Sequence, residues 1–218
     1  MQNYAKERKI NGKRHYEVPT GGVYPSVTTV LSSVPNPKLQ AWIDYVGEKV
    51  AAYARVQGAK RGEEFHTMVE KYLKCESLAE HKKLLPRALF DQAVPLLMNI
   101  TDIQTQEQVL WSDELKIAGR VDCIAKYCGV ETVIDFKTAS KPKDEADIQN
   151  YFQQATCYSL MYEERTGKKI DKILLIISCE SGDIQLISKD REPYIESLKS
   201  IIEQYHTSRE IQDDIFVE

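Results

Sequence analysis

The chain has 218 residues and a formal net charge of −4, with 42% hydrophobic and 28% charged residues. A chain of this length can bury about 70% of its unfolded surface, so we expect one domain over residues 1–218. The charge argues against a protein whose whole surface is basic. It does not exclude a nucleic-acid-binding protein, because a local basic lining is enough to bind phosphate.

The five cysteines are scattered and form no C-x-x-C pair, which argues against a disulfide framework and against a zinc finger. No apolar run reaches the roughly 20 residues that span a bilayer, and the first residues lack the apolar core of a signal peptide. We therefore expect a cytoplasmic protein, of a bacterium or of a phage-infected cell, that has no membrane partner.

A mainly helical portion (residues 1–100) is expected to precede an α/β core (residues 101–218). Basic residues flank the turn-forming pair Asn11-Gly12. An exposed arm or hairpin is the preferred interpretation of this start, and a phosphate-contacting arm is the alternative. Ser26 is a predicted N-cap of a short helix that begins with Val27.

Apolar side chains at helical spacing predict helix over residues 38–72, with a break at Gly58 and Gly62. Taken alone, Trp42 in this region is best interpreted as a core residue. The remaining elements are expected in the following order: a helix at 86–99, three strands within 107–137, a helix at 147–165, strands at 171–178 and 184–188, and a helix at 192–205.

The strands over residues 117–127 and 131–138 are expected to form a hairpin, because Cys128-Gly129 suits a two-residue turn. Alternation predicts one shared face for Ile117, Val121, Cys123 and Ala125. The same register places Asp122 opposite Asp135, where two carboxylates roughly 5 Å apart should repel each other. A bound divalent cation is the simplest compensation for that repulsion.

Asp135 and Lys137 lie two residues apart in an otherwise apolar strand, so both side chains are expected on one face, about 7 Å apart. A carboxylate followed two residues later by lysine occurs four times in the chain, and only this pair has such a setting. Phosphodiester hydrolysis needs acids that hold a metal and a cation that offsets charge on the phosphate.

The segments GRVDCIA and VIDFKTA resemble motifs two and three of the PD-(D/E)XK nuclease superfamily, in particular its RecB-like exonuclease subgroup. Gly62 and His66 match the G-x-x-x-H motif of this subgroup, and Gln154 and Tyr158 match its Q-x-x-x-Y motif. The segment YPSVTTVLS is also similar to the opening of the mitochondrial genome maintenance exonucleases and their phage relatives. The resemblance implies a mixed central sheet flanked by helices.

The resemblance also implies roles for particular residues. The implied metal ligands are His66, Asp122, Asp135 and the carbonyl oxygen of Phe136, and Lys137 is the implied catalytic lysine. The implied contacts with a nucleic acid strand are Gln154, Tyr158 and Tyr151. Arg61 is a further candidate for these contacts, although a solvated cation is its better interpretation as a single position. Glu107 is a candidate outer-shell acid or, equally, a surface residue at a strand entry.

The function implied is that of a metal-dependent DNA exonuclease that prefers single strands or free ends. It would use one or two Mg²⁺ or Mn²⁺ ions and act in DNA replication, repair or recombination, with proteins of those processes as partners. We expect no iron–sulfur cluster, because only Cys179 follows the last motif. The alternatives are a double-strand-end or flap nuclease, and a non-cleaving nucleic-acid-binding protein on the same fold.

Overall fold

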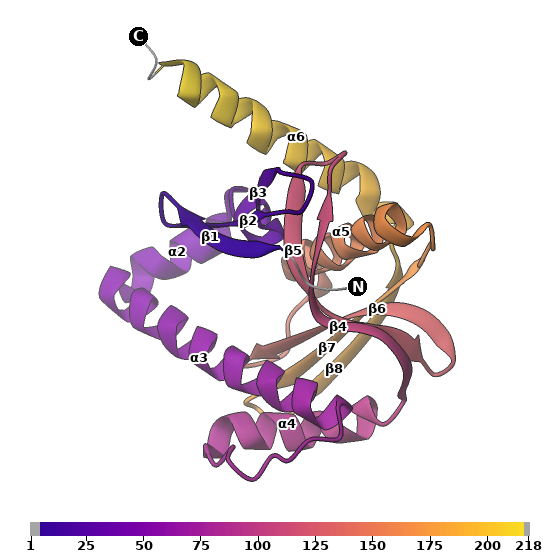
Figure 1. The fold of residues 1–218 in the computed structure, drawn as a ribbon. Coiled ribbons are helices and arrows are strands. Elements are labelled where there is room, and N and C mark those ends of the chain that lie inside the picture. Colours follow the sequence, from indigo (N-terminus) through magenta and orange to yellow (C-terminus); the bar gives the residue numbers. More distant parts are fainter. Residues whose placement is uncertain (1–4, 216–218) are drawn as a thin grey trace.

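A mixed sheet in the order β4-β5-β6-β7-β8 forms the centre of the computed structural model, which describes residues 5–215 (Figure 1). Strands β4 (Ile100–Ser112), β5 (Ile117–Tyr127) and β6 (Val130–Ala139) form an antiparallel meander. Strand β7 (Lys172–Cys179) runs parallel to β6, and β8 (Ile184–Asp190) runs antiparallel to β7. The parallel pair requires a crossover, which the helical segment between β6 and β7 supplies.

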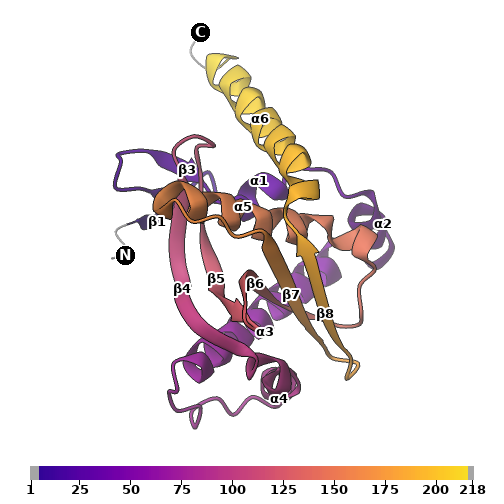
Figure 2. The same cartoon turned by 90° about the vertical axis from the view of Figure 1, so that its right-hand side faces the viewer.

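Helices cover both faces of this sheet, as Figure 2 shows from the side, so the predicted fold class is confirmed. One layer contains α1 (Val27–Leu31), α5 (Gln149–Thr166) and α6 (Glu192–Ile215). The other contains α3 (Glu48–Leu73) and α4 (Leu84–Leu97). Within the described residues, no helix is both long enough and apolar enough to cross a membrane.

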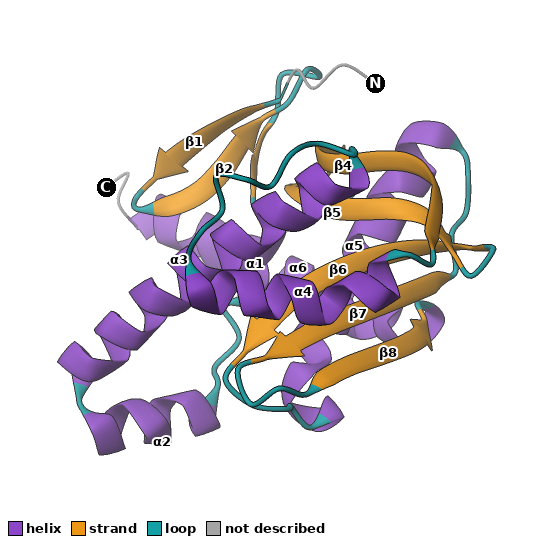
Figure 3. Ribbon diagram, turned by 90° about the horizontal axis from the view of Figure 1, so that it is seen from below, coloured by secondary structure: helices purple, strands orange, loops and turns teal. Residues whose placement is uncertain are grey.

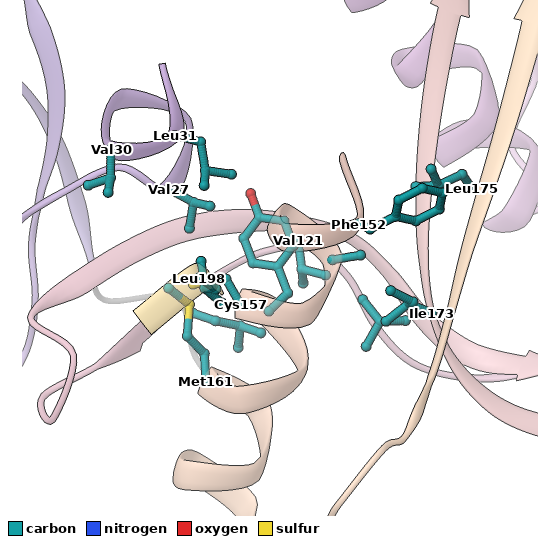
Figure 4. Close-up of a cluster of buried hydrophobic side chains, with 14 of the residues drawn as sticks. Val27, Val30, Leu31, Val121, Phe152, Cys157, Met161, Ile173, Leu175 and Leu198 are labelled. Carbon is teal, nitrogen blue, oxygen red and sulfur yellow. The ribbon is translucent and has the colours of Figure 1, made fainter. Parts of the chain in front are cut away.

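Two hydrophobic cores result, one under each helical layer. The first core joins α1, α5 and α6 to the sheet (Figure 4), and its members include Val27, Val121, Phe152, Met161, Ile173 and Leu198. The second core joins α3 and α4 to the sheet, and its members include Phe65, Met68, Phe90, Cys123, Ala125, Ile134 and Phe136. The central strands are therefore buried on both sides, which suits their nearly continuous apolar sequences.

Residues 6–25 form a small separate sheet of β1 (Lys6–Ile10), β2 (Lys13–Glu17) and β3 (Val23–Pro25). The predicted hairpin at Asn11-Gly12 is confirmed. The predicted cap is confirmed as well, because the Ser26 side chain accepts a hydrogen bond of 3.1 Å from the amide of Thr29. The N-terminal portion is thus helical only from Val27 onward, since its first segment is strand.

The predicted helix break at Gly58 and Gly62 is wrong. Helix α3 is continuous through both glycines, and the chain breaks earlier, at Gly47, which separates α3 from α2 (Pro37–Val46). Gly47 has φ +82°, a conformation that side-chain-bearing residues rarely adopt. Glycine in a helix costs only about 1 kcal/mol relative to alanine, so packing can keep a helix intact through two of them.

The interpretation of Trp42 as a core residue is also wrong. Helix α2 has no buried residue, and the side chains of Leu39, Trp42 and Tyr53 are 50%, 41% and 67% exposed. In Figure 3, α2 and the first turns of α3 project away from the central sheet. Helical spacing reveals an apolar stripe, but it does not reveal whether another part of the chain covers that stripe.

The prediction that Ile117, Val121, Cys123 and Ala125 share one face of the sheet is wrong. Cys123 and Ala125 lie in the second core, whereas Ile117 and Val121 lie in the first core with Ile124. The simple alternation therefore changes face between Val121 and Cys123. The change occurs at Asp122, where regular pairing with both neighbouring strands is interrupted.

The predicted register of the hairpin is confirmed over its paired length, with Lys126 opposite Glu131 and Tyr127 opposite Val130. The ladder ends at Cys123 and Ile134, one position before the two acids would pair. The strands thus part where the sequence predicted carboxylate repulsion.

The exposed stripe gives a prediction about stability. Tyr53→Ala should change the free energy of unfolding by less than about 1 kcal/mol, because most of this side chain is already in water. Phe152→Ala, at a fully buried position of the first core, should cost about 3–5 kcal/mol. Urea denaturation of the two variants tests this contrast. A decrease at Tyr53 as large as that at Phe152 would mean that part of the protein covers α3.

Candidate active site

Strand β6 contributes a buried ion pair. Lys137 Nζ lies 2.5 Å from Asp135 Oδ2, and Asp135 is 1% exposed. Among the described residues, neither carboxylate oxygen has a hydrogen-bond partner beyond this contact. Burial, with the nearby charge of Asp122, raises the pKa of Asp135 to about 6, although Lys137 acts in the opposite direction. Burial acts against the charge of Lys137, but Asp135 and Asp122 outweigh it and raise the pKa of the lysine.

Strand β5 contributes Asp122, which is also buried. Its Oδ2 accepts a hydrogen bond of 2.8 Å from the backbone amide of Phe136. The side chain thereby satisfies a buried β6 amide where the backbone ladder has ended. The bond also fixes the direction of the second oxygen, Oδ1, which faces α3.

Strand β4 contributes Glu107 through an irregular backbone. Gln106 pairs with Cys123 and Gln108 with Val121, so Glu107 lies opposite Asp122 without being paired to it. Its φ of +50° is in the left-handed region, which costs roughly 1–2 kcal/mol for a residue with a side chain. The same conformation occurs at turn residues such as Asn11 and Cys128, but Glu107 lies inside a strand, and strained backbone outside turns is enriched at functional sites.

Helix α3 contributes His66, which completes a cluster with the two acids. His66 Nδ1 lies 3.6 Å from Asp122 Oδ1 and 3.7 Å from Glu107 Oε1. One ligand atom from each of these three residues lies within 4.8 Å of the others. Burial acts to lower the pKa of His66, but Asp122 and Glu107 outweigh it and raise the pKa.

This donor set fits a divalent cation. Carboxylate oxygens are the ligands that Mg²⁺ and Mn²⁺ prefer, and the imidazole is a nitrogen donor of the kind that transition metals accept. Asp135 adds two buried oxygens whose one polar contact among the described residues is the ion pair with Lys137. The resemblance implied His66, Asp122 and Asp135 as side-chain ligands, and the sequence left Glu107 as either an outer-shell acid or a surface residue. The structure brings Glu107 about as close to His66 as Asp122 is, so Glu107 is a further candidate ligand. The role of the Phe136 carbonyl stays a prediction.

Helix α5 covers this cluster from the opposite layer. The ring of Tyr151 lies 5.2 Å from Lys137 Nζ, and the side-chain amide of Gln154 donates to the hydroxyl of Tyr158 at 3.3 Å. A cavity of about 350 Å³ opens here. Its lining residues are Thr28, Leu31, Ser32, Lys137, Asn150, Tyr151 and Gln154.

Three polar residues of this cavity, Thr28, Ser32 and Asn150, were not predicted as site residues. Thr28 and Ser32 are four residues apart, a spacing that places two side chains on one side of a helix. They fall in the YPSVTTVLS segment, whose resemblance to nuclease sequences was the only signal of their location. Asn150 follows the short 3₁₀ helix η1 (Glu145–Ile148), and no motif in the sequence marked it as a site residue.

Two of the recognised motifs meet at Gly119. A Cβ atom added there would lie 2.9 Å from Tyr158 Cε1 and 3.0 Å from Val27 Cγ2. Both neighbours are buried, so neither can move away freely. The glycine that begins the GRVD segment is thus required for close packing of the tyrosine that ends the Q-x-x-x-Y motif.

Arg61 lies next to the site, but its side chain already contacts other residues of the protein. Its Nε donates to Thr138 Oγ1 at 3.3 Å, and its guanidinium forms an ion pair with Glu180. Thr138 follows Lys137 in β6, so Arg61 lies close to the ion pair. The predicted contact of Arg61 with a nucleic acid strand would compete with Glu180.

Comparison with known proteins relates this geometry to a family. Residues 38–214 match the sequence model of the PD-(D/E)XK nuclease superfamily. The mitochondrial genome maintenance exonuclease 1 proteins of Mus musculus and Xenopus tropicalis are 29% and 31% identical to the chain. These matches cover 55% and 56% of this chain, and each covers 38% of the relative. The chain thus matches well under half the length of these curated relatives.

A solved structure described as a candidate exonuclease from Eubacterium rectale is 14% identical, with a TM-score of 0.44. The likeness covers 66% of each of the two chains.

The close packing at Gly119 gives a test that uses a second motif glycine as its control. Gly119→Ala should lower the free energy of unfolding by about 1–3 kcal/mol, because a buried ring must shift. Gly62→Ala should be neutral or stabilising, since its added Cβ meets only Thr138 Oγ1 at 3.8 Å and alanine favours helix. Chemical denaturation of both variants measures the difference. Equal effects would contradict the packing role of Gly119.

The buried carboxylate gives a prediction about pH. The folded-state pKa of Asp135, about 6, lies above its ordinary value of 3.8, so the folded protein holds an extra proton between these values. The stability that this proton provides is present at low pH and disappears as pH rises through about 6. The decrease is roughly 3 kcal/mol, from about two pKa units at 1.36 kcal/mol each.

Urea denaturation of metal-free protein at about pH 4.5 and about pH 6.5 should show roughly 2 kcal/mol of this decrease, because the rest of it lies below pH 4.5. Asp135→Asn should remove that part of the pH dependence, and the exposed Asp190→Asn should leave it unchanged. The same pH dependence in both variants would contradict the assignment.

Proposed function

Because the chain belongs to the PD-(D/E)XK nuclease superfamily, whose members use divalent metals, we propose that it is a metal-dependent DNA exonuclease acting on single strands or free ends. The observation that carries the proposal is the buried Asp135–Lys137 pair next to the His66, Glu107 and Asp122 cluster. Three acids gathered in a partly buried site cost stability unless a cation or protons balance their charge. The names of the curated relatives support exonuclease over endonuclease activity.

The residues proposed to hold Mg²⁺ or Mn²⁺ are Asp122, Asp135, Glu107 and His66, with the carbonyl of Phe136 as a further candidate. His66 must be neutral and the acids ionised to do so, which means that binding displaces the protons held at Asp135 and His66. When bound, such an ion acts as a Lewis acid and lowers the pKa of a coordinated water.

Lys137 is proposed to position the attacking water and to offset charge on the scissile phosphate. Its raised pKa keeps the ammonium protonated at neutral pH, so it acts as a fixed cation and hydrogen-bond donor and not as a base. In the hydrolysis, the water oxygen forms a bond to phosphorus and the bond from phosphorus to the leaving oxygen breaks. The attacking water gives up one proton to the solvent, and the leaving oxygen takes up one proton from the solvent, so the step is balanced.

The preference for an unpaired strand is supported by the side chains around the cavity. Tyr151 and Gln154 offer a ring and an amide to unstacked bases, the combination typical of single-strand binding. Exposed aromatic side chains on α2 and α3, among them Trp42 and Tyr53, extend the supply of stacking groups. Lys38 Nζ lies 2.5 Å from Asp147 Oδ1, which ties α2 to the segment just before α5.

Two broader statements belong to the same proposal. The described chain is proposed to be one nuclease domain, because Val27 and Leu31 of α1 share the first core with α5. The biological role is proposed to be in DNA replication, repair or recombination. Partners from those processes and the cytoplasmic location remain proposals.

The proposal predicts the outcome of a digestion assay. End-labelled single-stranded DNA should be degraded in the presence of Mg²⁺ or Mn²⁺, and EDTA should abolish the reaction. Lys137→Ala and Asp122→Asn should each reduce the rate by roughly 100-fold or more, because each removes a charge next to the scissile phosphate. Lys199→Ala, on the exposed side of α6, is the matched control and should leave the rate unchanged.

Three further substrates distinguish the alternatives. Circular single-stranded DNA should resist digestion, and its cleavage would indicate an endonuclease. Faster digestion of blunt duplex or of a flap substrate would favour a double-strand-end or flap nuclease. Binding of DNA without cleavage under any metal would favour a non-cleaving protein. Glu107→Gln should weaken Mn²⁺ binding in calorimetry, because it replaces an anionic oxygen ligand by a neutral amide.

A further inference from the structure

A second cavity, of about 230 Å³, lies at the N-terminal end of β5, away from the cluster described above. It is bounded by β2 and β3, by Lys116 in the turn before β5, and by α6. The polar and aromatic residues of its lining are His15, Tyr24, Lys116, Tyr205, His206 and Arg209. No carboxylate is among the described residues that line it, so the described lining carries positive charge, from Lys116 and Arg209.

Both histidines direct one ring nitrogen to a backbone carbonyl and keep the other nitrogen uncommitted. His15 Nδ1 lies 3.0 Å from the carbonyl oxygen of Lys13, and His206 Nε2 lies 3.2 Å from that of Leu115. A carbonyl oxygen can only accept, so these two nitrogens carry the protons. His15 Nε2 and His206 Nδ1 have no hydrogen-bond partner among the side chains that the structure describes, which extend to Arg209.

The two permanent cations of the cavity are Lys116 and Arg209. Neither Lys116 nor Arg209 forms an ion pair with another described residue, although most charged residues of the small sheet do. The guanidinium of Arg209 lies 5.5 Å from the centre of the Tyr205 ring, which keeps it at the cavity.

The ring of Tyr205 contributes to the cavity wall, whereas its hydroxyl is not a binding group there. Tyr205 is 5% exposed, and its hydroxyl is buried without a hydrogen-bond partner among the described residues. Tyr24, by contrast, already donates its hydroxyl to Asp113 at 3.0 Å.

We propose that this cavity binds a phosphate group. Two cations and two imidazole nitrogens surround a space that holds no competing acid among the described residues, which is the chemistry that recognises a compact anion with several oxygens. A metal ion is disfavoured, because Lys116 and Arg209 would repel it. The phosphate can come from a nucleic acid strand or from a free nucleotide.

A nucleic acid strand can connect the two sites. Lys116 precedes Asp122 by six residues, which is roughly 20 Å along an extended strand. About six nucleotides cover this distance at the 3.4 Å spacing of B-form DNA. The strand as the source of the phosphate rests on the proposed function, whereas phosphate binding itself does not depend on cleavage.

The first measurement uses the four histidines of the chain as reporters. In metal-free protein, inorganic phosphate should shift the imidazole ¹⁵N resonances of His15 and His206 saturably, at constant ionic strength. His81, which lies against Glu64 and Glu80, should not shift. The double variant Lys116→Gln/Arg209→Gln should weaken the binding at least tenfold. The charge-matched Lys82→Gln/Lys199→Gln should not.

The second measurement identifies the source of the phosphate, using the inactive Lys137→Ala protein. If it is the strand, Lys116→Gln/Arg209→Gln should weaken binding of a twelve-nucleotide oligothymidylate and leave a four-nucleotide one unaffected. The slope of log K against log salt should fall by about 0.7 for each phosphate that the variant no longer neutralises. Unchanged binding of both oligonucleotides, together with shifts induced by phosphate, supports the same site with a free nucleotide as ligand.

Equal small shifts at all histidines, or none at His15 and His206, would overturn the proposal. A protein that cleaves no DNA but shows the two selective shifts would refute the nuclease activity and retain this site.

Discussion

The hydrogen bond from the Phe136 amide to the Asp122 carboxylate is the interaction on which the site depends. In a regular ladder a backbone carbonyl of β5 would accept from this amide. Because a side chain accepts instead, β5 and β6 can separate after Cys123 and Ile134 without leaving a buried donor unsatisfied. The separation gives Asp122 and Asp135 the room that direct pairing would deny them.

The charges explain why this arrangement is compatible with a folded chain. Three carboxylates, on Glu107, Asp122 and Asp135, surround Lys137 and His66 in a largely buried space. The negative charge exceeds the positive charge, which is why the pKa values of His66 and Lys137 are raised. The pKa of Asp135 is raised chiefly by burial, with a smaller contribution from the charge of Asp122. The protein without metal therefore balances the excess with protons. A divalent cation can replace those protons. Without a cation, the site becomes less stable as the pH rises, because the protons that balance its charge are lost.

The sequence predicted the parts of the site that depend on local periodicity. Asp135 and Lys137 share a strand face because side chains alternate, and the turn at Cys128-Gly129 sets the register that places Lys126 and Tyr127 opposite their predicted partners. The position of His66 could be predicted only from the resemblance to a family, since nothing local links a helix residue to a strand 56 residues later.

Other features depend on tertiary structure and could not be predicted. The position of Glu107 follows from a left-handed backbone conformation within a strand, which the pattern of residues in the sequence does not predict. Thr28 and Asn150 meet at one cavity only because α1 packs beside α5. The exposure of Trp42 shows the same limit, because an apolar stripe on a helix does not reveal which element covers it. The continuity of α3 through Gly58 could not be predicted either, because the cost of one glycine is too small to decide whether a helix ends.

Helix α3 connects two environments, and His66 lies where they meet. Its second half is fixed by Phe65, Met68 and Val69, all fully or almost fully buried. In its first half only Ala51 is buried, and that half leads back through Gly47 to α2. The imidazole is therefore held by the residues that flank it in the core, whereas the preceding turns contribute little to the stability of the fold. The apolar side chains of these turns are better explained by contact with a molecule that binds at the site than by packing within the chain.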